Sequence, residues 1–72
     1  MNLDKKLEFI LEVIEAVDVS NITIDTSLED CPDWDSIAAL SVMSEVDDEF
    51  DVIISADQME NCKTFADIIK LF

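Results

Sequence analysis

Residues 33–51 read DWDSIAALSVMSEVDDEFD, and this stretch decides the fold because an acidic loop turns into an amphipathic helical pattern within it. Asp35 is a typical N-cap residue, which predicts a helix from Ser36 to Phe50. The first turn of such a helix has backbone N–H groups without intrahelical partners and carries the positive end of the helix dipole. We therefore expect Ser36 to be exposed where a phosphate ester on its hydroxyl would be stabilised.

The predicted helix has an apolar face and a mixed face. Helical spacing directs five apolar side chains toward a core: Ala39, Val42, Met43, Val46 and Phe50. The side chains expected to face solvent are Ile37, Leu40, Ser41 and Ser44. The last turn carries Glu45, Asp47, Asp48 and Glu49. Carboxylates at a helix C-terminus oppose the dipole, so their presence favours a role in binding over a role in stability.

The residues before this helix predict another helix, the first in the chain, and a loop that follows it. Apolar residues at helical spacing indicate a first helix over residues 3–17, with Val17 on its buried side. Residues 18–35 are rich in Ser, Asn, Asp and Thr and are expected to form a long ordered loop. Loops of this length are uncommon and usually functional. Within it, we expect Trp34 to pack against the bundle and Cys31 to be exposed.

The residues after Phe50 predict a connector and two further helices. Residues 51–54 are expected to be extended, and Ser55 is expected to cap a short third helix. Thr64, with an aspartate three residues later, approximates a capping box for a last helix over residues 65–72. The chain has no glycine, on which hairpin turns depend. The predicted fold class is all-α: one domain over residues 1–72, forming a small four-helix bundle with a short third helix and a long loop between helices 1 and 2.

The charge of the chain limits its partners. The formal net charge is −14, and no basic residue lies between Lys6 and Lys63. Nucleic acid is therefore excluded as an expected partner, and proteins with basic surface patches are favoured. The opening residues do not form a signal peptide and no segment is apolar enough for membrane insertion, so we expect a cytoplasmic protein.

The residue types argue against catalysis and against a metal site. Nucleophilic catalysis by Ser36 would need a base, and the chain has no histidine. Two cysteines without histidine fall short of a zinc site, and an EF-hand loop requires glycine at its sixth position. We expect Cys62 to lie in the core rather than to be reactive. The sequence thus predicts no enzyme and no metal.

The segments 33–37 (DWDSI) and 45–51 (EVDDEFD), in this order of helices, resemble the acyl carrier protein family. The resemblance covers roughly the whole chain and is most specific at Asp35-Ser36 followed by an aliphatic residue. It implies that Ser36 carries a covalent 4′-phosphopantetheine cofactor, whose terminal thiol holds an acyl or aminoacyl group as a thioester. The chain would then be a carrier in fatty-acid, polyketide or related biosynthesis.

The resemblance also implies a monomer that meets a phosphopantetheinyl transferase and acyl-loading, synthase and acyltransferase enzymes with basic patches. The expected partner-binding residues are Asp35, Ile37, Leu40, Glu45, Asp47 and Asp48. The expected acyl pocket is lined by Val42, Met43, Val46, Met59, Cys62 and Ile68. Family members usually keep acidic residues where this chain has Ala38 and Ser41, which we expect to form a neutral patch with Ile37 and Leu40. This departure and the Trp-Asp-Ser-Ile context favour a specialised carrier over primary fatty-acid synthesis.

Two other functions are compatible with the residues. One is an unmodified acidic helical protein–protein interaction module, in which Ile37 and Leu40 dock in a groove of the partner. The other is a weak calcium buffer formed by the carboxylates near the end of the predicted second helix. A gain of phosphopantetheine mass would separate the carrier from both.

Overall fold

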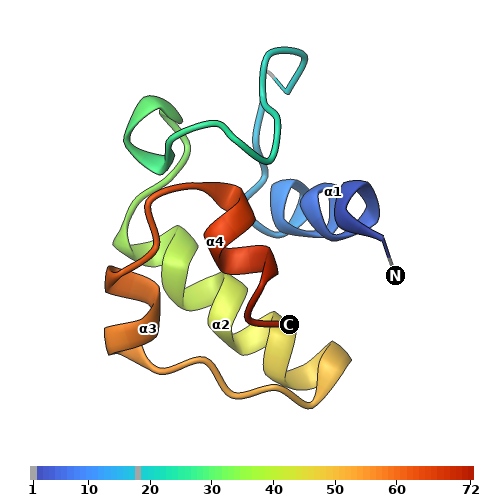
Figure 1. Ribbon diagram of the computed structural model, residues 1–72, viewed down its shortest axis with the longest axis vertical. Coiled ribbons are helices and arrows are strands. Elements are labelled where there is room, and N and C mark those ends of the chain that lie inside the picture. The colour runs from blue at the N-terminus through green and yellow to red at the C-terminus, as the bar shows by residue number, and fades with distance from the viewer. Residues whose placement is uncertain (1, 18) are drawn as a thin grey trace.

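The computed structural model describes residues 2–17 and 19–72, and these residues form helices without a named strand. The elements are α1 (Leu3–Val13), the short 3₁₀ helix η1 (Leu28–Asp30), α2 (Ser36–Phe50), α3 (Ala56–Glu60) and α4 (Phe65–Ile69) (Figure 1). Helix α1 packs against both α2 and α4. The predicted all-α fold with a short third helix is confirmed.

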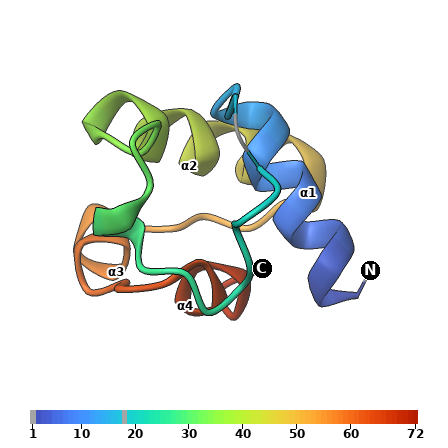
Figure 2. The ribbon, with the colours of Figure 1, turned by 90° about the horizontal axis from the view of Figure 1, so that it is seen from above.

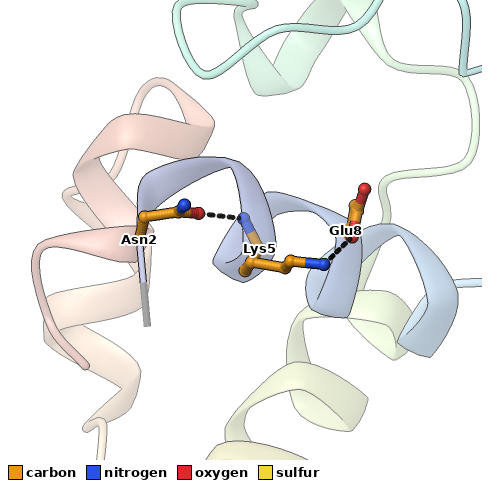
Figure 3. Close-up of polar contacts among 3 residues, drawn as sticks. All are labelled: Asn2, Lys5 and Glu8. Carbon is orange, nitrogen blue, oxygen red and sulfur yellow. Dashed lines mark hydrogen bonds and ion pairs between the residues drawn. The ribbon is translucent and has the colours of Figure 1, made fainter.

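Side-chain caps explain where the helices begin. At α1, the Asn2 side chain accepts a hydrogen bond of 2.9 Å from the Lys5 N–H, and Lys5 forms an exposed ion pair with Glu8 (Figure 3). At α3, Ser55 and Gln58 form a capping box, and at α4 Thr64 forms one with Asp67. Caps of this kind each contribute about 1 kcal/mol. Because α3 and α4 have five residues each, too few for stability in isolation, they depend on these caps and on packing.

Helix α1 ends earlier than its apolar pattern predicts. The last helical residue is Val13, and Glu15 then adopts a left-handed conformation with φ of 55°. The Ala16 N–H donates to the Leu11 carbonyl at 3.0 Å, which closes the helix end in the manner of a Schellman motif. Val17 is consequently 88% exposed, so its expected place on the buried side of the first helix is wrong.

The long loop before α2 is fastened to the start of α4 by backbone hydrogen bonds. The Leu28 N–H donates to the Lys63 carbonyl at 2.9 Å, and the Ala66 N–H donates to the Ile24 carbonyl at 2.7 Å. An isolated antiparallel bridge between Ser27 and Thr64 lies between these bonds. The expected ordered loop is confirmed for the described residues, and Asp18 lies outside them.

The core is built from all the helices and the loop. Its fully buried large side chains are Phe65, Ile10, Ile68, Ile69, Val42 and Val46. Trp34 packs edge-on against Phe65 with ring centroids 6.0 Å apart, which confirms the packing role predicted for this tryptophan. Helix α4 ends at Ile69 rather than at Phe72, because the last residues form turns while the Phe72 ring packs against Phe50 at 5.0 Å.

Cys31 corrects another expectation, because it is buried and only 4% exposed. Its N–H donates to the Leu28 carbonyl at 3.2 Å at the end of η1, and this turn directs the thiol into the core cluster. The sequence suggested exposure because a cysteine between acidic residues in a polar loop has no local pattern that indicates burial.

Candidate functional site

Ser36 is the first residue of α2 and is exposed. The residue before it, Asp35, has extended backbone, and its Oδ1 accepts a hydrogen bond of 2.7 Å from the Ala38 N–H. The predicted N-cap is therefore confirmed. It holds Ser36 at the positive end of a 15-residue helix, where a phosphate ester is electrostatically favoured.

A cavity of about 670 Å³ opens beside Ser36. Three segments line it, and Figures 1 and 2 show that η1, the start of α2 and α3 gather at the same end of the molecule. The lining residues are Ser27, Leu28, Glu29, Trp34, Asp35, Ser36, Ala39, Leu40, Met43, Ala56, Met59, Glu60, Cys62 and Lys63. An apolar chain attached near Ser36 would thus have a largely apolar hollow within reach.

The structure divides the six residues predicted for an acyl pocket into two groups. Met43, Met59 and Cys62 line the cavity. Val42, Val46 and Ile68 do not line it, since they are fully buried in the core. Helical spacing alone cannot separate these groups, because both lie on the inner side of the bundle.

Several lining residues were missed by sequence reasoning. Leu28 and Lys63 reach the cavity because the loop is bonded to the residues before α4. The alternating apolar residues of the loop were the available signal, since they indicate a segment pinned over the helices. These apolar residues do not indicate which part of the helices the loop contacts.

The predicted partner-binding residues all lie at the surface of α2 or at its cap. Ile37 is 74% exposed and Leu40 is 63% exposed, and their spacing of three residues makes them neighbours on the surface of α2. The acidic members, Asp35, Glu45, Asp47 and Asp48, are exposed as well. Along α2, the two apolar residues lie between Asp35 at the cap and the three carboxylates of the last turns, and we refer to these six residues as the α2 face.

Ala38 does not belong to this surface, because it is only 6% exposed. The expected neutral patch of Ile37, Leu40, Ala38 and Ser41 is therefore wrong at this residue. Ala38 falls one turn before Val42 and so shares the inner side of α2. Ser41 is partly buried and lines a second, shallow hollow together with residues of α1.

Val17 is a further surface residue that sequence reasoning missed. Its N–H donates to Asp33 Oδ2 at 3.2 Å, which places it beside the segment that leads into Ser36. No local signal indicated this contact, because it follows from the reversal of the chain at Glu15.

The protein thiol in the cavity is not an activated nucleophile. Cys62 Sγ donates to the Gln58 carbonyl at 3.3 Å, and burial, together with the negative charge of Asp67, raises the pKa of this thiol. The thiol therefore stays protonated at neutral pH. Across residues 2–17 and 19–72, no three potential metal ligands gather at one place. None of the helices described is long and apolar enough to cross a bilayer.

Comparisons with known proteins agree with this geometry. A family profile described as a phosphopantetheine attachment site matches residues 5–72. The chain is 31% identical over 70 residues to an acyl carrier protein of Exiguobacterium sibiricum, covering 89% of each chain. It is 32% identical over 65 residues to an acyl carrier protein of onion yellows phytoplasma, covering 90% of this chain and 86% of the relative. No solved structure gives a significant match.

The fold and the match define a small helical domain that bears phosphopantetheine. The chain belongs to the acyl carrier protein family. It is a carrier and not an enzyme, and its cofactor is covalently attached 4′-phosphopantetheine. Its partners as a family member are a phosphopantetheinyl transferase and biosynthetic enzymes.

Proposed function

We propose that Ser36 bears the 4′-phosphopantetheine arm and that the chain, as one domain over residues 1–72, delivers acyl or aminoacyl groups to partner enzymes. The observation that carries this proposal is the position of Ser36, which is exposed at the start of α2 and also lines the 670 Å³ cavity. The bound arm supplies a thiol that holds the acyl group as a thioester. No other serine of α2 combines these two features.

The side chains around Ser36 have separate tasks in this function. Asp35 keeps the first turn of α2 in place by capping the Ala38 N–H. Ile37 and Leu40 provide apolar area for a docking enzyme, and the carboxylates of the α2 face attract basic patches and speed encounter. Met43, Met59 and Leu28 provide apolar walls for a short acyl chain, while Val42, Val46 and Ile68 would be reached only if the core opened.

The proposed setting is fatty-acid, polyketide or related biosynthesis in the cytoplasm, with the protein acting as a monomer. The α2 face has fewer carboxylates along the first turns of α2, where Ile37 and Leu40 lie beside Ser41, than along the last turns. This supports enzymes of a specialised pathway as the partners that load and unload the arm.

The test is the intact mass of the protein after incubation with coenzyme A and several phosphopantetheinyl transferases. We expect the wild type to gain one phosphopantetheine, Ser36→Ala to gain none, and Ser44→Ala to gain one. Ser44 is a matched control because it is also an exposed serine on α2 but does not line the cavity. A gain by Ser36→Ala would move the attachment site elsewhere. No gain by the wild type would favour the unmodified interaction module.

A further inference from the structure

Lys63 lines the same cavity as Ser36, and it is the only basic residue among the cavity-lining residues. The other charged residues of the lining are Glu29, Asp35 and Glu60. A phosphodiester on Ser36 would add negative charge to this wall of carboxylates. Like charges that share one cavity repel one another, so a cation on its wall makes the cavity more favourable for an anion.

The backbone of Lys63 is fixed from both sides. Its N–H donates to Asp67 Oδ2 at 2.8 Å, and its carbonyl accepts the Leu28 N–H at 2.9 Å. These bonds hold the base of the side chain at the junction of the loop, α3 and α4. The ammonium group therefore searches only the space that its own four-carbon stem allows.

The side chain of Lys63 is exposed and has no ion pair or hydrogen bond within the part of the chain that the structure describes. Two other lysines have such partners, since Lys5 pairs with Glu8 at 3.9 Å and Lys6 Nζ donates to the Phe72 carbonyl. The side chain of Lys70 forms neither kind of bond among the described residues, but Lys70 does not line the cavity. In a chain with a net charge of −14, a cation without a partner on the wall of the cavity that Ser36 also lines is an available anion-binding group.

We propose that Lys63 binds an oxyanion held in this cavity, and so directs the arm along the α3 wall rather than over the exposed α2 face. The inference rests on the proposed attachment at Ser36. Two groups offer the required chemistry: the phosphodiester of the arm, and the free carboxylate of a dicarboxylic acyl group. Lys63 acts as a positioning residue, since the covalent bond to the cargo is made at the thiol of the arm.

The experiment compares apo, holo, butyryl and succinyl forms of the wild type, Lys63→Gln, Lys63→Arg and Lys70→Gln by NMR. Lys70 is a matched control, because it is an exposed lysine that does not line the cavity. The readouts are the Nζ signal of Lys63 and the backbone amide signals of Met43 and Met59. Intact mass establishes that each variant has been converted, and the apo spectra establish that each is folded.

If the phosphodiester is the ligand, the Nζ signal of Lys63 shifts between the apo and holo forms. If the carboxylate is the ligand, it shifts only in the succinyl form and not in the butyryl form. In either case, the amide signals of Met43 and Met59 shift together with the Nζ signal in the wild type. These amide shifts are lost in Lys63→Gln. They are kept in Lys63→Arg and in Lys70→Gln. Identical shifts in Lys63→Gln and the wild type would overturn the inference while leaving attachment at Ser36 intact. Absence of any mass gain in the wild type would overturn the proposed function and this inference together.

Discussion

The two halves of α2 are built for different purposes. On the inner side of its last turns, the ring of Phe50 packs against Phe9 at 5.2 Å and against Phe72 at 5.0 Å. Its first turns leave Ile37 and Leu40 in solvent and border an open cavity. The difference teaches that the aromatic contacts of α2 gather at the end away from Ser36, whereas the large apolar side chains that it leaves in solvent lie near Ser36.

Removing the aromatic contacts at the last turns of α2 should have the largest effect. Phe50→Ala is expected to lower the free energy of unfolding by about 3 kcal/mol, because it leaves a gap between two other rings. Urea denaturation followed by circular dichroism measures this loss. At temperatures where the variant is folded, its modification at Ser36 should match the wild type. A modification defect in the folded variant would mean that the two halves are not separate.

Shortening an exposed side chain near Ser36 should have the opposite result, because it should impair modification and leave stability nearly unchanged. Leu40→Ala is expected to leave the free energy of unfolding within about 0.5 kcal/mol, because the side chain is largely solvated. It should lower kcat/KM of a phosphopantetheinyl transferase about tenfold, which corresponds to about 1.4 kcal/mol of lost binding.

Ile53→Ala is the control for Leu40→Ala. Ile53 is 82% exposed, but it lies in the connector after α2 and not on the α2 face. Its removal should change neither stability nor modification. Equal kinetic defects in both variants would show that exposed apolar area in general, and not the α2 face, is what the transferase recognises.

Asp35 tests the boundary between structure and recognition at one residue. Asp35→Ala removes the 2.7 Å bond to the Ala38 N–H and should lower the free energy of unfolding by about 1 kcal/mol. Asp35→Asn keeps an acceptor at the same place and should be nearly as stable as the wild type, but without the charge. Thermal melts and modification rates of both variants therefore separate the effect of the cap from that of the charge. Equal stability of the two variants would contradict the capping role.

The smallest expected effect concerns pH at the start of α4. The N–H groups of Lys63 and Thr64 donate to the Asp67 carboxylate and lower its pKa below the ordinary 3.8. A lowered pKa in the folded state means that the ionised carboxylate stabilises the fold above pH 3.8, and that this contribution is lost as the pH falls through the lower folded value. The melting temperature of Asp67→Asn should therefore lie below that of the wild type near neutral pH and converge with it in acid. A difference in melting temperature between the two proteins that widens in acid would contradict the lowered pKa of Asp67.

The parts of this protein that sequence predicted well are those governed by near neighbours. Asp35 as N-cap, the span of α2 and the Thr64–Asp67 capping box depend on residues within one turn, and the structure has them as expected. The exposure of Ile37 and Leu40 also followed from helical spacing.

The parts that sequence missed depend on residues far apart in the chain. Burial of Cys31, exposure of Val17 and the cavity wall at Lys63 all follow from where the loop lies against the helices. Apolar spacing continued past Val13, but a reversal at Glu15, a residue type that rarely has positive φ, ended the helix. Local patterns carry no information on such long-range pairings. The attachment of the arm at Ser36 is a prediction of another kind, which the intact mass of the protein tests.

The backbone bonds between the loop and the start of α4 also set an order of events during synthesis. They join residues 24–28 to residues 63–66, which leave the ribosome at very different times. Closing so long a segment costs chain entropy before any bond is gained, so this pairing is expected late in folding. Helix α2 can therefore present Ser36 on the nascent chain before the wall containing Lys63 exists. A transferase that acted at that stage would meet Ser36 before the cavity wall at Cys62 and Lys63 had formed.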